Sequence, residues 1–156
     1  MSERESDSSQ RAFYSLSAAL TGFDTFDLHA TGVGDTYFAT AQARLGEATL
    51  GALLRGWQRI EREQPNSSDA RDAALTREIL QTAEFGPSAR RIIMLWYTGS
   101  WYASPDDASV VSPQAYTAGL MWQAVGGHAM GANPQGFGAW TLPPPTTDAE
   151  PQQKGA

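Results

Sequence analysis

The chain has 156 residues, of which 41% are hydrophobic and 18% are charged, a size and composition that suit one domain with a buried core. Its 17 acidic and 11 basic residues give a net charge of −6. The basic residues are scattered, which argues against nucleic acid as a partner because phosphate backbones are bound by clustered Lys and Arg. The absence of cysteine excludes disulfides, Cys-ligated zinc, iron–sulfur clusters and covalently attached c-type haem in this chain.

Membrane insertion and export leave recognisable sequence patterns. The longest apolar run, residues 92–97, is far shorter than the roughly 20 residues that cross a bilayer, so we expect no membrane span. Residues 1–10 have mixed charge and lack the apolar segment that is typical of a signal peptide. The Arg90–Arg91 pair lies in the middle of the chain and does not form a twin-arginine leader.

The composition divides the chain into three parts. Residues 1–9 are polar and predict a disordered N-terminal arm. Apolar residues at helical spacing over 10–130 predict a helical domain. In 131–156, Gly, Pro, Asn and Gln dominate, which predicts an extended C-terminal tail with Phe137 and Trp140 as isolated aromatic residues.

Apolar residues spaced by three and four predict about six helices with short connections. The first begins near Ser9, a good N-cap, and ends at Gly22, whereas 23–34 fits either a helical turn or a loop. We find no sustained alternation typical of strands, so the sequence predicts an all-α, irregular orthogonal helical bundle with an extended C-terminal tail. The later helices are expected over 35–45, over 50–64, from cap residues in 66–69 to an end at Gly86–Pro87, over 87–101, and from Ser112–Pro113 to about 125.

Few residues suggest chemistry. His29 and His128 are the side chains that ordinarily titrate near neutral pH, but neither has a spacing typical of metal sites. Asp24 and Asp27 could pair as acid and base, but they lie in a turn-like segment where Asp commonly caps backbone N–H groups. The sequence therefore predicts no catalytic residue, no metal site and no cofactor-binding site in this chain.

A dense series of aromatic and Met residues lies between Arg90 and Trp140 and includes four of the five tryptophans. The helix over 87–101 is apolar almost all round, so it is buried in the core or covered by a partner, and core is favoured. The tail aromatics either lie across the domain or insert into another protein. The predicted partner-binding residues are Trp96, Tyr97, Trp101, Tyr116, Met121, Trp122, Phe137 and Trp140.

Four motifs, in the same order along the chain, carry a family resemblance. Together they resemble the small subunit of membrane-bound, FAD-dependent sugar and polyol dehydrogenases, with the closest similarity to the sorbitol and fructose dehydrogenase small subunits. The motifs are Tyr14–Gly22, Ile93–Gly99, Tyr116–Trp122 and Pro134–Pro143.

The resemblance implies an auxiliary, chaperone-like subunit with no redox centre of its own. In such complexes a large flavoprotein subunit holds FAD and oxidises the sugar or polyol, and a multihaem cytochrome c subunit passes the electrons on. The small subunit binds the flavoprotein as a heterodimer and supports its folding, maturation and export. The implied location is the periplasm or the periplasmic face of the inner membrane, although the twin-arginine leader common in the family does not occur in this sequence.

Two other functions stay open on the sequence alone. One is a helical protein that binds a small apolar ligand in a pocket lined by Trp96, Met121 and Trp122. The other is an enzyme that uses His29 or His128 as a general base.

Overall fold

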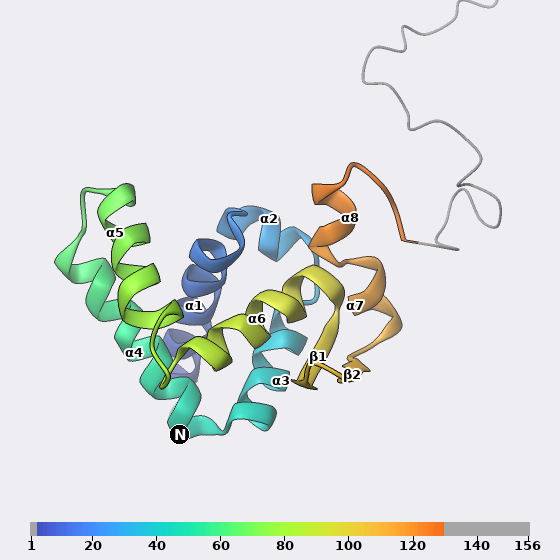
Figure 1. Ribbon diagram of the computed structural model, residues 1–156, viewed down its shortest axis with the longest axis horizontal. Helices are drawn as coiled ribbons and strands as arrows, with labels where there is room; N and C mark the ends of the chain where they lie inside the picture. The colour runs from blue at the N-terminus through green and yellow to red at the C-terminus, as the bar shows by residue number, and fades with distance from the viewer. Residues whose placement is uncertain (1–2, 130–156) are drawn as a thin grey trace, which may run out of the picture.

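The computed structural model describes residues 3–129, and the prediction of a mostly helical, irregular bundle is confirmed (Figure 1). The predicted tail over 131–156 lies outside the described residues. In chain order the elements are α1 (Glu3–Thr21), α2 (Thr25–Ala30), α3 (Gly34–Leu45), α4 (Glu47–Glu63), α5 (Ser68–Leu75), the π-helical η1 (Thr76–Leu80), α6 (Gly86–Thr98), β1 (Ser100–Ser104), β2 (Asp107–Val110), α7 (Pro113–Thr117) and α8 (Leu120–Ala124).

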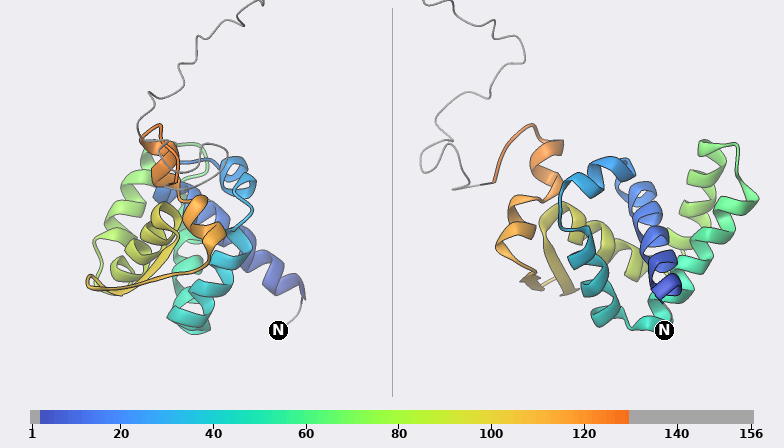
Figure 2. Two further views of the ribbon diagram at one scale, coloured as in Figure 1. Left: turned by 90° about the vertical axis from the view of Figure 1, so that its right-hand side faces the viewer. Right: turned by 180° about the vertical axis from the view of Figure 1, so that it is seen from behind.

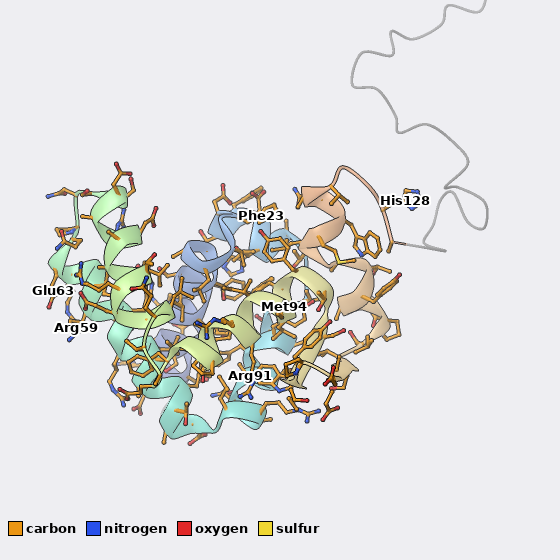
Figure 3. All side chains as sticks on the ribbon, viewed as in Figure 1. Phe23, Arg59, Glu63, Arg91, Met94 and His128 are labelled. Atoms are coloured by element: carbon orange, nitrogen blue, oxygen red, sulfur yellow. The ribbon has the colours of Figure 1, made fainter. Side chains whose placement is uncertain are left out.

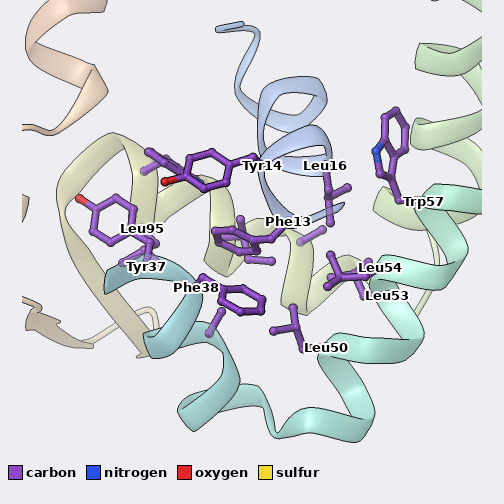
Figure 4. Close-up of a cluster of buried hydrophobic side chains, with 14 of the residues drawn as sticks. Phe13, Tyr14, Leu16, Tyr37, Phe38, Leu50, Leu53, Leu54, Trp57 and Leu95 are labelled. Atoms are coloured by element: carbon purple, nitrogen blue, oxygen red, sulfur yellow. The ribbon is translucent and has the colours of Figure 1, made fainter. Parts of the chain in front are cut away.

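The core lies where α1, α3, α4 and α6 meet (Figure 4). Helix α6 crosses the molecule, with α4 and α5 on one side of it and the hairpin, α7 and α8 on the other (Figures 1 and 2). Helix α4 shows why the bundle forms, because its large apolar residues recur every three or four positions and all of them are buried. These residues are Leu50, Leu53, Leu54, Trp57 and Ile60.

Side-chain caps start several of the shorter helices. The side chains of Asp24, Ser67 and Ser112 each accept a hydrogen bond from the backbone N–H three residues further on, at 2.8, 3.1 and 3.0 Å. These bonds satisfy N–H groups that have no partner within the helix. The predicted capping role of Asp24 is therefore confirmed.

Helix α1 begins at Glu3, well before the predicted start near Ser9, so it includes most of the segment expected to be a disordered arm. Residues 4–8 are exposed and add nothing to the core. Glu and Arg have good helix propensity, and an ion pair joins Asp7 to Arg11 one turn later. Helix propensity and this ion pair extend a helix whose C-terminal half is held in place by packing in the core.

A two-stranded hairpin follows α6, which the sequence did not predict. Helix α6 ends at Thr98 because Gly99 adopts a left-handed conformation with φ 68°, and β1 then pairs antiparallel with β2. The register is irregular between Tyr102 and Ser104. Trp101, expected at the end of a helix, therefore lies in a strand.

The helix predicted over 113–125 is two short helices, α7 and α8. Gly119 separates them with φ −53° and ψ 126°, which is not helical. A Cβ atom at this position would lie 2.7 Å from the carbonyl oxygen of Tyr97. The chain turns here because only a residue without a Cβ can come so close to the C-terminal end of α6.

Candidate protein-binding surface

Two of the predicted partner-binding residues, Trp96 and Trp101, lie in the core. Trp96 is 0% exposed, and its ring lies 4.8, 6.2 and 6.4 Å, between centroids, from those of Tyr37, Tyr14 and Phe13. Trp101 is 3% exposed. Neither side chain offers surface to a partner in this conformation. The burial of Trp96 among core rings also gives no support to a ligand pocket that it would share with Met121 and Trp122.

Four others are partly exposed and are held by contacts within the domain. The hydroxyl of Tyr97 donates to the carbonyl of Thr21 at 2.8 Å. The Tyr116 and Trp122 rings meet edge to face with centroids 5.7 Å apart, and Trp122 Nε1 donates to the carbonyl of Tyr116 at 2.9 Å. Met121, next to Trp122 in the sequence, is partly exposed. The remaining two predicted residues, Phe137 and Trp140, lie outside the described residues.

Tyr97, Tyr116, Met121 and Trp122 come from α6, α7 and α8, and the ribbons of α8 and α2 lie near each other in the views of Figures 1 and 2. Phe23 lies edge to face with Tyr97 at 6.2 Å between centroids (Figure 3). Phe26 and Val125 are 78% and 75% exposed. We call this set the α2–α8 surface: Phe23, Phe26, Tyr97, Tyr116, Met121, Trp122 and Val125.

The sequence contains a signal for Phe26 that the prediction missed. In a helix, residues two apart point to nearly opposite sides. Leu28 is fully buried, so Phe26 must lie on the outer side of α2 once that segment is known to be helical. The helical state of 23–34 was ambiguous from sequence, and for that reason the exposed ring was not foreseen.

A small cluster of titratable side chains is formed by Tyr14, His29 and Asp35. The Tyr14 ring stacks on the exposed His29 ring at 3.7 Å between centroids, and its hydroxyl donates to Asp35 Oδ1 at 3.1 Å. Burial, reinforced by the Asp35 carboxylate, raises the pKa of Tyr14 to about 12. Tyr14 is therefore a neutral hydrogen-bond donor at neutral pH, and this arrangement supports a structural role for His29.

The second histidine has a local contact, since Nδ1 of His128 lies 3.1 Å from the carbonyl oxygen of Ala129. Within residues 3–129, no group of three or more His, Asp or Glu side chains is arranged to hold a metal ion.

Stability at alkaline pH should report on two buried phenols. Burial raises the pKa of Tyr37 to about 12 as well, whereas an unfolded tyrosine titrates near 10. The folded state thus favours the neutral phenols. The contribution of these raised pKa values to the free energy of unfolding is fully present below about pH 10 and is lost as the pH rises to about 12. We expect the urea midpoint to fall across this interval, and to fall less steeply in a Tyr14→Phe/Tyr37→Phe variant than in a Tyr102→Phe control. Equal pH profiles for the two variants would contradict this explanation.

A groove of about 450 Å³ lies between α6 and the hairpin. Arg91 Nη2 donates to the carbonyl of Ala103 at 2.9 Å across it, and Arg90 Nη2 donates to the carbonyl of Leu80 at 3.0 Å. Figure 3 shows Arg91 and Met94 together on α6. The groove, called here the α6–β1 groove, is lined by Pro87, Arg90, Arg91, Met94, Tyr102, Ala103, Ser104 and Pro105.

Comparison with known proteins gives no relative from which a function could be transferred. No protein-family model, curated protein or solved structure matches this chain. Across residues 3–129, the helices are too short or too polar to cross a membrane.

Proposed function

We propose that this chain is the non-catalytic small subunit of an FAD-dependent sugar or polyol dehydrogenase of the sorbitol and fructose dehydrogenase kind. It binds the flavoprotein large subunit through the α2–α8 surface and supports folding, maturation or export of that subunit. FAD resides in the partner, and a multihaem cytochrome c subunit and a periplasmic location belong to the same proposal.

The observation that carries the proposal is that Tyr97, a residue of the α2–α8 surface, joins three of the resemblance motifs. Tyr97, in the Ile93–Gly99 motif, donates its hydroxyl hydrogen to the carbonyl of Thr21 in the Tyr14–Gly22 motif. Its own carbonyl lies against Gly119 of the Tyr116–Trp122 motif. The fourth motif, Pro134–Pro143, lies outside the described residues. Segments far apart in sequence therefore build one end of the molecule together.

The physical character of this end suits a protein partner. Phe26, in α2, and Val125, at the end of α8, expose most of their apolar side chains, and exposed large apolar residues are a feature of interaction sites. Tyr116 and Trp122 are already fixed by their ring contact and hydrogen bond. Aromatic residues held in place before binding lose little side-chain entropy, and Trp and Tyr are enriched among residues that dominate binding energy.

Co-expression with a cognate flavoprotein dehydrogenase tests the proposed function. We expect the flavoprotein to gain FAD content, activity and soluble yield when this chain is present. The proposal fails if the flavoprotein reaches the same FAD content, activity and yield without it.

Removing anchor side chains should weaken the complex. We expect Trp122→Ala, and likewise Phe137→Ala and Trp140→Ala, each to weaken association by about 2 kcal/mol, as loss of a central aromatic contact does. Titration of the purified chain against the flavoprotein measures this. Two exposed valines supply a matched control, because Val125 is on the α2–α8 surface and Val110, 60% exposed, is in the hairpin. Val125→Asp should weaken binding and Val110→Asp should not; equal effects would place the contact elsewhere.

A further inference from the structure

The α6–β1 groove is formed by residues that the α2–α8 surface does not use. Pro87, Arg90, Arg91 and Met94 are spaced by three, four and seven positions, so they form one stripe along α6. Met94 is 37% exposed although its neighbours Leu95 and Trp96 are fully buried. The stripe is thus the outer face of an otherwise buried helix.

Within the described part of the chain, Arg90 and Arg91 resemble Arg44 and Arg62 in lacking an ion pair, but they are adjacent in sequence and each donates to a backbone carbonyl. Arg11, Arg59 and Arg77 each lie within 4.0 Å of a carboxylate, but no described Asp or Glu comes within that distance of Arg90 or Arg91. Two neighbouring positive charges thus remain without an ion-pair partner among residues 3–129 of a chain whose net charge is −6. An acidic ligand would supply the missing countercharge.

Both guanidinium groups are also held in position. Arg90 donates one N–H to the carbonyl oxygen of Leu80, and Arg91 donates one to the carbonyl oxygen of Ala103. A guanidinium carries five N–H donors, so further donors stay available for a carboxylate. Anchored arginines lose less side-chain entropy when they bind than mobile ones do.

The rest of the lining is mostly apolar and suits an extended chain. Pro87, Met94, Tyr102 and Pro105 surround the space, and proline and aromatic surfaces pack well against extended peptide segments. Met adapts its shape to different apolar side chains. We propose that the α6–β1 groove binds an extended acidic segment of another protein, with carboxylates on Arg90 and Arg91 and a neighbouring apolar side chain on Met94 and Tyr102.

Selection from a random dodecapeptide library displayed on phage, with the full chain as target, tests this proposal. We expect the selected peptides to carry two or more Asp or Glu residues beside an aliphatic or aromatic residue. A fluorescently labelled selected peptide should then bind at least about ten-fold more weakly to Arg90→Gln/Arg91→Gln, because two charge-assisted contacts to carboxylates are lost. Arg44→Gln/Arg62→Gln, which removes two exposed arginines on other helices, is the control and should bind normally.

Other results would overturn the proposal. Selected peptides without acidic residues, no enrichment, or equal binding to the two double variants would show that the arginines do not recognise carboxylates. Deletion of 131–156 checks a competing occupant, since a large gain in peptide affinity would show that the chain's own tail fills the groove. Flavoprotein binding is measured in parallel for Arg90→Gln/Arg91→Gln and for Trp122→Ala. This measurement distinguishes a failure of the groove proposal from a failure of the proposed function. Circular dichroism melts confirm that the variants are folded.

Discussion

Gly99→Ala should lower the free energy of unfolding by about 3 kcal/mol, which is large for the replacement of one hydrogen atom by a methyl group. Gly99 ends α6 with φ 68°, a conformation that costs a residue with a Cβ roughly 1–2 kcal/mol. The added Cβ would also lie 2.3 Å from the carbonyl oxygen of Ala115 and 2.7 Å from the backbone nitrogen of Tyr116. Both are main-chain atoms of α7, so that helix must move. Urea denaturation measures the effect.

Gly22→Ala is the matched control because Gly22 ends α1 in the same way. Its φ is 80°, and its N–H donates to the carbonyl of Ala18 at 3.0 Å, just as the N–H of Gly99 donates to the carbonyl of Leu95 at 2.9 Å. At Gly22, however, no atom lies within 4 Å of an added Cβ. We expect a loss of only about 1 kcal/mol, from backbone strain alone. Equal losses of unfolding free energy for Gly22→Ala and Gly99→Ala would show that α7 can shift away from the added Cβ without destabilising the fold.

Helices with a strong amphipathic pattern were predicted well from sequence. In α4 the apolar stripe from Leu50 to Ile60 is buried as its spacing requires, and the helix ends at Glu63, before Pro65. The helix starts predicted within 66–69 and at Ser112 were likewise correct, because the cap is a local interaction that the sequence encodes within four residues.

The hairpin was missed because its strands carry almost no alternating pattern. All of β2 is exposed, and in β1 the two buried residues, Ser100 and Trp101, are adjacent. An isolated two-stranded hairpin is at best marginally stable. Here Trp101 is buried in the core and Val111 N–H donates to Gly99 at 3.0 Å. Tertiary contacts therefore stabilise strands that local propensity does not predict.

Which side of α6 faces outward could not be read from the sequence. Residues 92–97 are all apolar, so periodicity alone cannot separate the exposed Met94 from the buried Trp96 two positions later. The two faces are distinguished by the elements that cover the helix, among them α1, α3 and α8, and these contacts join residues distant in sequence. For this reason the predicted binding residues included Trp96 and omitted the groove stripe.

Trp96 itself combines tight packing with an unusual polar atom. It is among the largest fully buried side chains, and rings from α1 and α3 surround it. Its Nε1–H is buried without a hydrogen-bond partner among the described residues. A buried donor that lacks an acceptor costs roughly 1–3 kcal/mol of stability. The packing of the Trp96 ring must therefore offset this cost.

Trp96→Ala should lower the free energy of unfolding by about 4 kcal/mol, because the cavity left by a buried tryptophan collapses only in part. Small domains are stable by only about 5–15 kcal/mol, so the variant should unfold at markedly lower urea concentration. Trp96→Phe keeps a ring and removes the unpaired N–H, and should cost only about 1–2 kcal/mol. Trp122→Ala, at a partly exposed site, should cost less than Trp96→Ala while weakening association more. The opposite order, with Trp122 dominating stability, would reverse the division between core and binding surface.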